Sequence, residues 1–280
     1  MKRYTFTACL LVLTLMTGCA NTTRTEEPPR VVVTDAVTEL PAASASVTET
    51  VYPAASTAAI TETAAITTAE ETAPAALAGI RIGLDPGHQA HGNSGQEAIA
   101  PDDPRTKDKV TGGAVGTATG IPEYVTVLEI ADLLRRKLEA EGATVYMTRE
   151  THDVDISNQE RTKMMNEYGV DLMLRIHCDA SGNAETSGIG LFVSESNAIA
   201  AQSFEYAGII QPIVCEAVGA QNRGITQNDN YTGQNWAEVP CIMIECGFLS
   251  NPEEDRQLND PAYQEKLAAA ICDGIKACFS

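Results

Sequence analysis

Three apolar runs, far apart in the chain, lead directly to ionisable side chains. The runs cover residues 80–84, 172–177 and 240–245, and they lead to His88, His177 and Glu245. Short runs rich in Ile, Leu and Met are typical of buried strands. Because the carboxyl ends of parallel strands meet at one rim of a sheet, we expect these three side chains to lie together.

Helical patterns alternate with the strand patterns. Apolar residues recur at helical spacing from Val127 to Leu138, which predicts a helix over 123–141 that Gly142 ends. Further helices are expected at 157–168, 198–218 and 261–278, and further strands at 143–148 and 189–194. The alternation predicts one α/β domain with a mainly parallel, twisted sheet and helices on both faces.

Local signals refine this prediction at three places. Ser157 and Glu160 have the spacing of a helix N-terminal capping box. Pro212 lies inside the third predicted helix and is expected to kink it. Residues 89–122 contain several Gly and Pro and mixed charges, and they are interpreted as one long loop.

The N-terminus is typical of a targeting segment. Lys2 and Arg3 precede an apolar run over 8–16, and residues 15–19 resemble a lipoprotein signal in which Cys19 is the lipidated residue. We therefore predict a signal peptide over 1–18 and an extracytoplasmic domain anchored to the membrane by lipid. An ordinary secretory signal and a short membrane anchor remain alternatives, although the run is short for a bilayer span.

Residues 19–78 are rich in Ala, Thr, Pro, Ser and Glu, with Tyr52 as their aromatic residue. Such a segment buries too little apolar surface to offset the entropy of ordering, so we predict a disordered linker and place the catalytic domain at 79–280. The formal net charge of −19 excludes a nucleic-acid partner, because phosphate binding requires clustered cations.

Six of the eight cysteines lie in the predicted domain. Cys241 and Cys246 are an odd number of residues apart on one predicted strand and so face opposite sides of the sheet. Cys272 and Cys278 are not helical neighbours. We expect most of the six to be reduced and buried, with a long-range pair between Cys215 and a C-terminal cysteine left open.

The predicted rim has the residues of a catalytic zinc site. His88 and His177, together with either Glu245 or Glu123, which opens the first predicted helix, make a His2Glu set with one position open for water. The second carboxylate is then left as a general base. His91 is a rival ligand through its H-x-x-H spacing, and Glu123 is alternatively a charge that favours the helix dipole.

Other polar residues near the rim have more than one interpretation. His152 is expected to be an exposed loop residue, and Arg175 is interpreted as an ordinary edge charge. Asp179, Arg223 and Asn235 are candidates for substrate contact, because a guanidinium binds carboxylates well. The alternative for Arg223 and Asn235 is a structural contact in a turn.

The region from about residue 80 to 279 resembles the zinc-dependent N-acetylmuramoyl-L-alanine amidases of the Amidase_3 type. The matching stretches are Asp85-Pro86-Gly87-His88, Glu123 with its helix, residues 142–149, Ile176-His177, and residues 245–251. The resemblance implies that His88, Glu123 and His177 bind one zinc ion and that Glu245 acts in catalysis. Two stretches depart from the family: Gln89-Ala90 replace two glycines, and Asp179 stands where the family has Asn.

The resemblance implies hydrolysis of the amide between N-acetylmuramic acid and L-alanine in peptidoglycan. Two alternatives stay open: a zinc peptidase that acts on another cell-wall bond, and a non-catalytic peptidoglycan-binding module. We expect a monomer. No helix is left over between His177 and Glu245 to act as an inhibitory plug.

Overall fold

The structure is a computed structural model that describes residues 75–280. The predicted signal peptide, Cys19 and nearly all of the predicted linker lie outside the described residues. Leu77 is fully buried, and its amide donates to the carbonyl of Glu141 at 2.8 Å. The packed part of the chain therefore begins at least at Leu77, two residues before the expected boundary. Within 75–280, no helix combines the length and apolar character that a membrane span requires.

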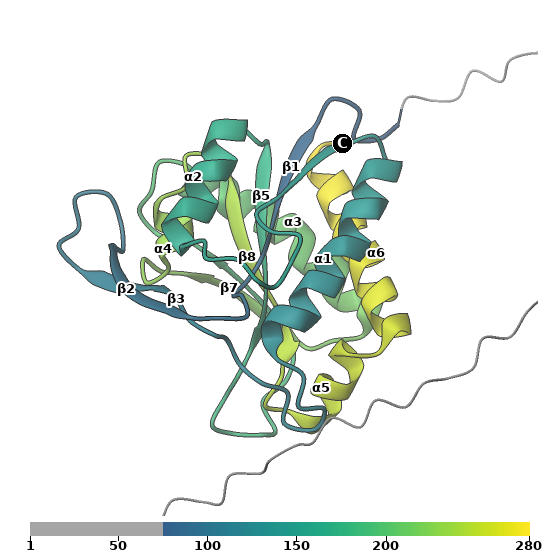
Figure 1. Ribbon diagram of the computed structural model, residues 1–280. Coiled ribbons are helices and arrows are strands. Elements are labelled where there is room, and N and C mark those ends of the chain that lie inside the picture. The colour runs from purple at the N-terminus through teal and green to yellow at the C-terminus, as the bar shows by residue number, and fades with distance from the viewer. Residues whose placement is uncertain (1–74) are drawn as a thin grey trace, which may run out of the picture. The chain divides into compact units, whose positions relative to one another are not determined.

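Six strands form the central sheet, in the order β4-β1-β5-β8-β6-β7 (Figure 1). Their bounds are β1 Arg81–Pro86, β4 Thr144–Met147, β5 Leu172–Asp179, β6 Ile189–Val193, β7 Asn222–Gln227 and β8 Cys241–Phe248. Strands β4, β1, β5 and β8 are parallel, whereas β6 runs antiparallel to β8 and β7 follows β6 in parallel. The predicted class, a mainly parallel α/β sheet, is confirmed.

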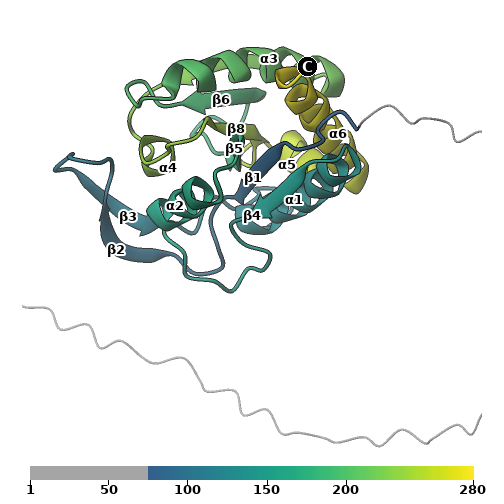
Figure 2. The same ribbon diagram turned by 90° about the horizontal axis from the view of Figure 1, so that it is seen from above.

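Helices cover both faces of the sheet (Figure 2). One face is covered by α1 Glu123–Ala140, α3 Ala200–Val218 and α6 Pro261–Cys278, and the other by α2 Asn158–Tyr168 and the short α4 Thr232–Asn235. Helix α2 begins with the predicted capping box of Ser157 and Glu160. Helix α3 continues through Pro212.

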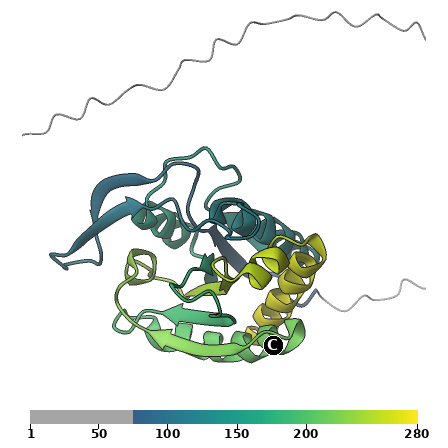
Figure 3. The ribbon, with the colours of Figure 1, turned by 90° about the horizontal axis from the view of Figure 1, so that it is seen from below.

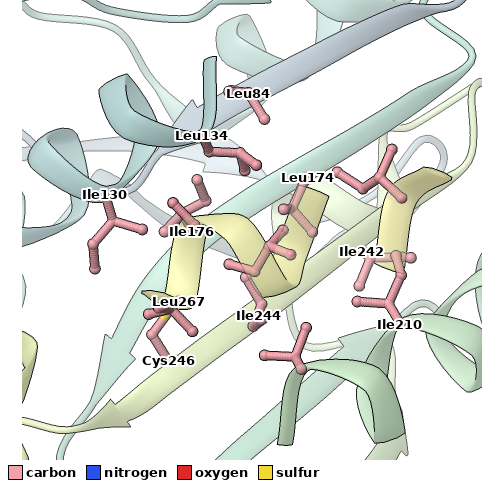
Figure 4. Packing of buried hydrophobic residues seen from close by; sticks show 14 of the residues in the cluster. Leu84, Ile130, Leu134, Leu174, Ile176, Ile210, Ile242, Ile244, Cys246 and Leu267 are labelled. Atoms are coloured by element: carbon pink, nitrogen blue, oxygen red, sulfur yellow. The ribbon is translucent and has the colours of Figure 1, made fainter. Parts of the chain in front are cut away.

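The alternation of side chains along the strands sorts the core into two parts. The larger part lies under α1, α3 and α6 (Figure 4) and contains Leu84, Leu174, Ile176, Ile242 and Ile244. A smaller cluster lies on the opposite face and contains Met165 of α2, Met173 and Cys241. Cys241 and Cys246 therefore face opposite sides, as predicted, and all six described cysteines are free thiols.

Five elements were not predicted. Residues 89–122, interpreted as a loop, contain the antiparallel strands β2 Asn93–Ala98 and β3 Thr106–Val110, which form a hairpin outside the main sheet (Figures 1 and 3). Their side chains are mostly polar and exposed, so no alternating apolar pattern marks them. The edge strand β7 lacks the pattern for the same reason. The short α4, and α5 at Pro252–Leu258, were also missed, although Asn251 caps α5 and Pro252 opens it.

Candidate active site

A buried carboxylate lies at the centre of the polar side of the sheet. Asp85 is fully buried near the end of β1, and its oxygens accept hydrogen bonds from Arg161 Nη1 at 2.9 Å and Arg175 Nε at 2.8 Å. Thr148 Oγ1 donates a third bond at 2.7 Å. Burial alone would raise the pKa of Asp85, but the two guanidinium groups hold it well below its usual range. The carboxylate is thus ionised and fixed.

Two arginines hold the turn that presents His88. Arg161 donates to the carbonyls of Pro86 and His88 at 2.9 and 2.8 Å, and Arg149 donates to those of Pro86 and Gly87 at 2.9 and 2.8 Å. The turn needs this support because His88 has a φ of 57°, in the left-handed region that non-glycine residues avoid. The backbone hydrogen bonds therefore fix a strained residue in the site.

The Arg161 contacts also explain the departure at Gln89. Its fully buried side chain accepts a hydrogen bond from Arg161 Nη2 at 3.0 Å through Oε1 and donates to the carbonyl of His91 at 3.0 Å. Gly87, by contrast, cannot change, because a Cβ there would lie 2.2 Å from the ring of His177. The imidazole of His177 therefore packs directly on the backbone of Gly87.

Three side chains converge beyond this turn. Glu123 Oε1 lies 3.1 Å from His88 Nε2 and 3.1 Å from His177 Nδ1, and the two ring nitrogens are 3.2 Å apart. Among residues 75–280, these three form the group of His, Cys, Asp and Glu whose ligand atoms are close enough to share a metal ion. Ligands at about 2.0–2.1 Å from a tetrahedral zinc lie roughly 3.3 Å apart, so the observed spacing fits.

The ligand atoms are oriented by groups around them. The Thr111 carbonyl lies 2.9 Å from His88 Nδ1 and can only accept, so Nδ1 carries the proton and Nε2 presents its lone pair. The two oxygens of Glu123 accept from the amides of Cys178 at 3.0 Å and Ala114 at 2.9 Å. With these hydrogen bonds in place, the metal-binding atoms of His88 and Glu123 face one another.

The protonation states also suit a divalent cation. Burial lowers the pKa of His177 to about 4, although Glu123 opposes the shift, so the imidazole is neutral at pH 7. Burial by itself would raise the pKa of Glu123, but the adjacent rings of His177 and His88 outweigh burial and bring the pKa below its ordinary range. Two imidazoles and one carboxylate make a set that a zinc ion complements.

Glu245 is a further carboxylate of this site. It is paired with His177 in the β5–β8 register, and both side chains line one hollow of about 630 Å³. Its Oε2 is buried without a hydrogen-bond partner among the described residues. Burial, followed by the charges of Glu123 and Asp179, raises the pKa of Glu245 well above its usual value. Such a carboxylate is suited to accept a proton.

Comparison with known proteins places this site in a family. Residues 82–277 match the family model Amidase_3, described as N-acetylmuramoyl-L-alanine amidase. The chain belongs to this family. It is 31% identical over 204 residues to the probable cell wall amidase LytH of Staphylococcus aureus, covering 73% of this chain and 60% of LytH. The chain thus spans about 60% of the length of that curated relative.

Solved structures of similar proteins agree with the fold. The apo form of the N-acetylmuramyl-L-alanine amidase Ami1 from Mycobacterium abscessus has a TM-score of 0.67 and 25% identity, covering 72% of this chain and all of the other. The N-acetylmuramoyl-L-alanine amidase from Clostridium difficile 630 has a TM-score of 0.59 and 27% identity, covering 72% and 96%.

The structure of this Amidase_3 domain separates the other candidate residues. Asp179 and Arg223 line a small hollow of about 90 Å³ beside Glu245, and Arg223 lies 4.9 Å from the ring centroid of Phe248. Asn235 is not brought to either hollow. It is buried in α4, and its side-chain amide donates to the carbonyls of Ile99 and Asp229 at 3.1 Å.

The structure also shows where His91, His152 and Arg175 lie. His91 is exposed and lies outside the group that can share a metal. His152, expected to be exposed, is partly buried and packs edge-to-face on Tyr124 at 5.3 Å. Arg175 is not an edge charge: β5 is a central strand, and the side chain is buried against Asp85. An Asp inside an apolar strand is the signal that could have predicted buried arginine partners.

Proposed function

We propose that this chain is a zinc-dependent N-acetylmuramoyl-L-alanine amidase that hydrolyses the amide between N-acetylmuramic acid and L-alanine in peptidoglycan. The observation that carries the proposal is the convergence of His88, Glu123 and His177 in the same hollow as Glu245. Family membership supports the choice of bond.

His88, Glu123 and His177 would hold one zinc ion. Zinc bound there supplies a Lewis acid that polarises the amide carbonyl and makes water a stronger nucleophile. The carboxylate of Glu245 takes a proton from the attacking water and gives it to the nitrogen of the leaving amine. Its raised pKa strengthens Glu245 as a base in the first transfer, and the protonated side chain then holds the proton that the leaving amine takes.

Product analysis tests this function. The purified domain, with its zinc content measured, is incubated with peptidoglycan, and the soluble products are identified by mass spectrometry. Release of intact stem peptides with an L-alanine amino terminus, and of peptide-free glycan, is the expected result. Glu245→Gln is the control and should release neither at the wild-type rate.

The same experiment separates the alternatives. Peptide fragments cut within the stem would identify a peptidase that acts on another cell-wall bond. Binding of peptidoglycan by a zinc-loaded protein without any release would identify a binding module. Either result would refute the proposed amidase activity.

Membrane anchoring is a separate part of the proposal. The signal-like residues 1–18 and Cys19 support a lipid-anchored, extracytoplasmic enzyme. Cys19→Ala should move the protein from the membrane fraction to the soluble fraction, because stable anchoring requires more than one acyl chain at that residue. If the variant stays in the membrane fraction, the apolar segment is itself the anchor and the lipidation proposal fails.

A further inference from the structure

The hollow that contains the proposed metal ligands is lined by more acidic than basic side chains. Its carboxylates are Asp108 of β3, Glu123 of α1, Asp179 of β5 and Glu245 of β8. The hairpin of β2 and β3 contributes Lys107, and β5 contributes Arg175. A substrate that fills this hollow therefore meets two cations in addition to these four carboxylates.

The charge of Arg175 is already used by the protein. Its Nε donates to Asp85 at 2.8 Å, Nη2 donates to the side chain of Asn158 at 2.8 Å, and Nη1 donates to that of Gln234 at 3.3 Å. Since every nitrogen of the guanidinium has a buried or partly buried protein partner, Arg175 is a structural group.

Lys107 is different, because its ammonium lacks a counter-charge. Its Nζ donates to the carbonyl of Asn230 at 2.8 Å and lies 5.7 Å from the ring centroid of Tyr231. Among residues 75–280, no carboxylate oxygen lies within 4.0 Å of it. An ammonium has three donors, so two remain for another partner.

The carboxylate opposite Lys107 in the hairpin does not neutralise it. Glu97 is its direct cross-strand neighbour, and such opposite charges commonly pair. The Glu97 side chain is buried and instead accepts from the amide of Gln159 in α2 at 3.2 Å. Burial and then the nearby charge of Arg175 lower the pKa of Lys107, as expected for a cation without an anionic partner.

We infer that Lys107 binds a carboxylate of the stem peptide and so determines the specificity of the proposed amidase for acidic stem peptides. This inference rests on the proposed function. The glycan side of the scissile amide is a neutral sugar, whereas the peptide side carries free carboxylates. A charge-assisted hydrogen bond from an ammonium favours the carboxylate. Lys107 therefore marks the side of the hollow that the peptide occupies.

A matched pair of substrates tests the inference. One is N-acetylmuramoyl pentapeptide with free carboxylates, and the other is the same compound with each carboxylate converted to a primary amide. The full zinc-loaded domain is compared with Lys107→Gln, which removes the charge, and with Lys107→Arg, which keeps it. Lys109→Gln is the control, because Lys109 lies two residues further along β3 and does not line the hollow.

The wild-type enzyme should prefer the free carboxylates. Lys107→Gln should lower kcat/KM for that substrate by about tenfold or more, mainly through KM, and leave the amidated substrate nearly unchanged, so the preference disappears. Lys107→Arg should keep most of the preference, and Lys109→Gln should behave as wild type.

Two results would overturn the inference. Equal losses on both substrates would show that Lys107 only supports the hairpin through Asn230, and no loss on either would show that the ammonium has no part in binding. Failure of the proposed function would be recognised separately, because the wild-type enzyme would then release no stem peptide from either substrate.

Discussion

The two faces of β1, β5 and β8 are built from alternate residues of the same strands and differ in chemistry. On one face, Leu84, Leu174 and Ile244 pack under α1, α3 and α6, as Figure 4 shows. On the other, Asp85, Arg175 and Glu245 occupy the next positions in the sequence. The first face is held by nondirectional packing, whereas around Asp85 and Arg175 the second is held by hydrogen bonds between charged groups.

The difference shows how a stable sheet supports a reactive site. Burial of apolar side chains tolerates small changes of shape, because its energy scales with area. A buried charge network does not, because removing one partner leaves the others desolvated and unpaired. The polar face is therefore expected to be more sensitive to single changes, and the following predictions test that expectation.

The largest effect is expected from Asp85→Asn. The change leaves two buried guanidinium groups facing one neutral amide, so the free energy of unfolding should fall by about 3–5 kcal/mol at pH 7. Chemical denaturation measures the loss. A loss below about 1 kcal/mol would show that the arginines find other partners and that the network is not central.

The pH dependence of that loss is a second test of Asp85. Because the folded-state pKa lies below the unfolded value of about 3.9, the carboxylate stabilises the fold fully above that value, and its contribution decreases as pH falls through the folded pKa. The difference between wild type and Asp85→Asn should stay constant from pH 7 to 5 and shrink below pH 4. A difference that grows on acidification would contradict the assignment.

On the apolar face, Leu174→Ala should destabilise by about 2–5 kcal/mol through a cavity. Leu174 is fully buried next to Arg175 in the chain but on the opposite side of β5. Zinc content and kcat of the folded fraction should stay near wild type. If this variant loses zinc while folded, the two faces are coupled and the separation proposed here is wrong.

The two glutamates of the polar face should differ when each is changed to Gln. Glu245→Gln should keep zinc and lose about 10²-fold or more in kcat, because the amide cannot accept a proton. Glu123→Gln should lose zinc first, and added zinc should restore part of the activity. Metal analysis and kinetics with a zinc titration measure both. If added zinc restores Glu245→Gln but not Glu123→Gln, then Glu245 is the metal ligand and Glu123 is the general base.

The smallest effect is expected from Ile244→Val, one residue before Glu245 but on the apolar face. The loss of one buried methylene should lower the free energy of unfolding by about 0.5–1.5 kcal/mol, with kcat unchanged. Paired measurements on Ile244→Val and Glu245→Gln compare the faces at adjacent positions. A tenfold fall in kcat for Ile244→Val would show that the apolar packing positions the base.

Local signals in the sequence predicted most regular elements. The apolar runs predicted β1, β5 and β8, the helical spacing predicted α1 from Glu123, and Ser157 with Glu160 predicted the start of α2. The same runs predicted that His88, His177 and Glu245 meet, because parallel strands bring their carboxyl ends together. These predictions depend on periodicity and on neighbours within a few residues, which one sequence contains.

Other features depended on the tertiary structure. Asp85 binds Arg161 and Arg175, which lie 76 and 90 residues further along the chain. No local sequence pattern indicates that these two arginines are its partners. The β2–β3 hairpin carries no apolar alternation, so the sequence did not predict its strands or the presence of Lys107 in the lining of the hollow. The sequence by itself determined which side chains face each side of a strand. Which distant charges they meet was decided by packing, because a buried charge is stable only where the completed fold supplies its partners.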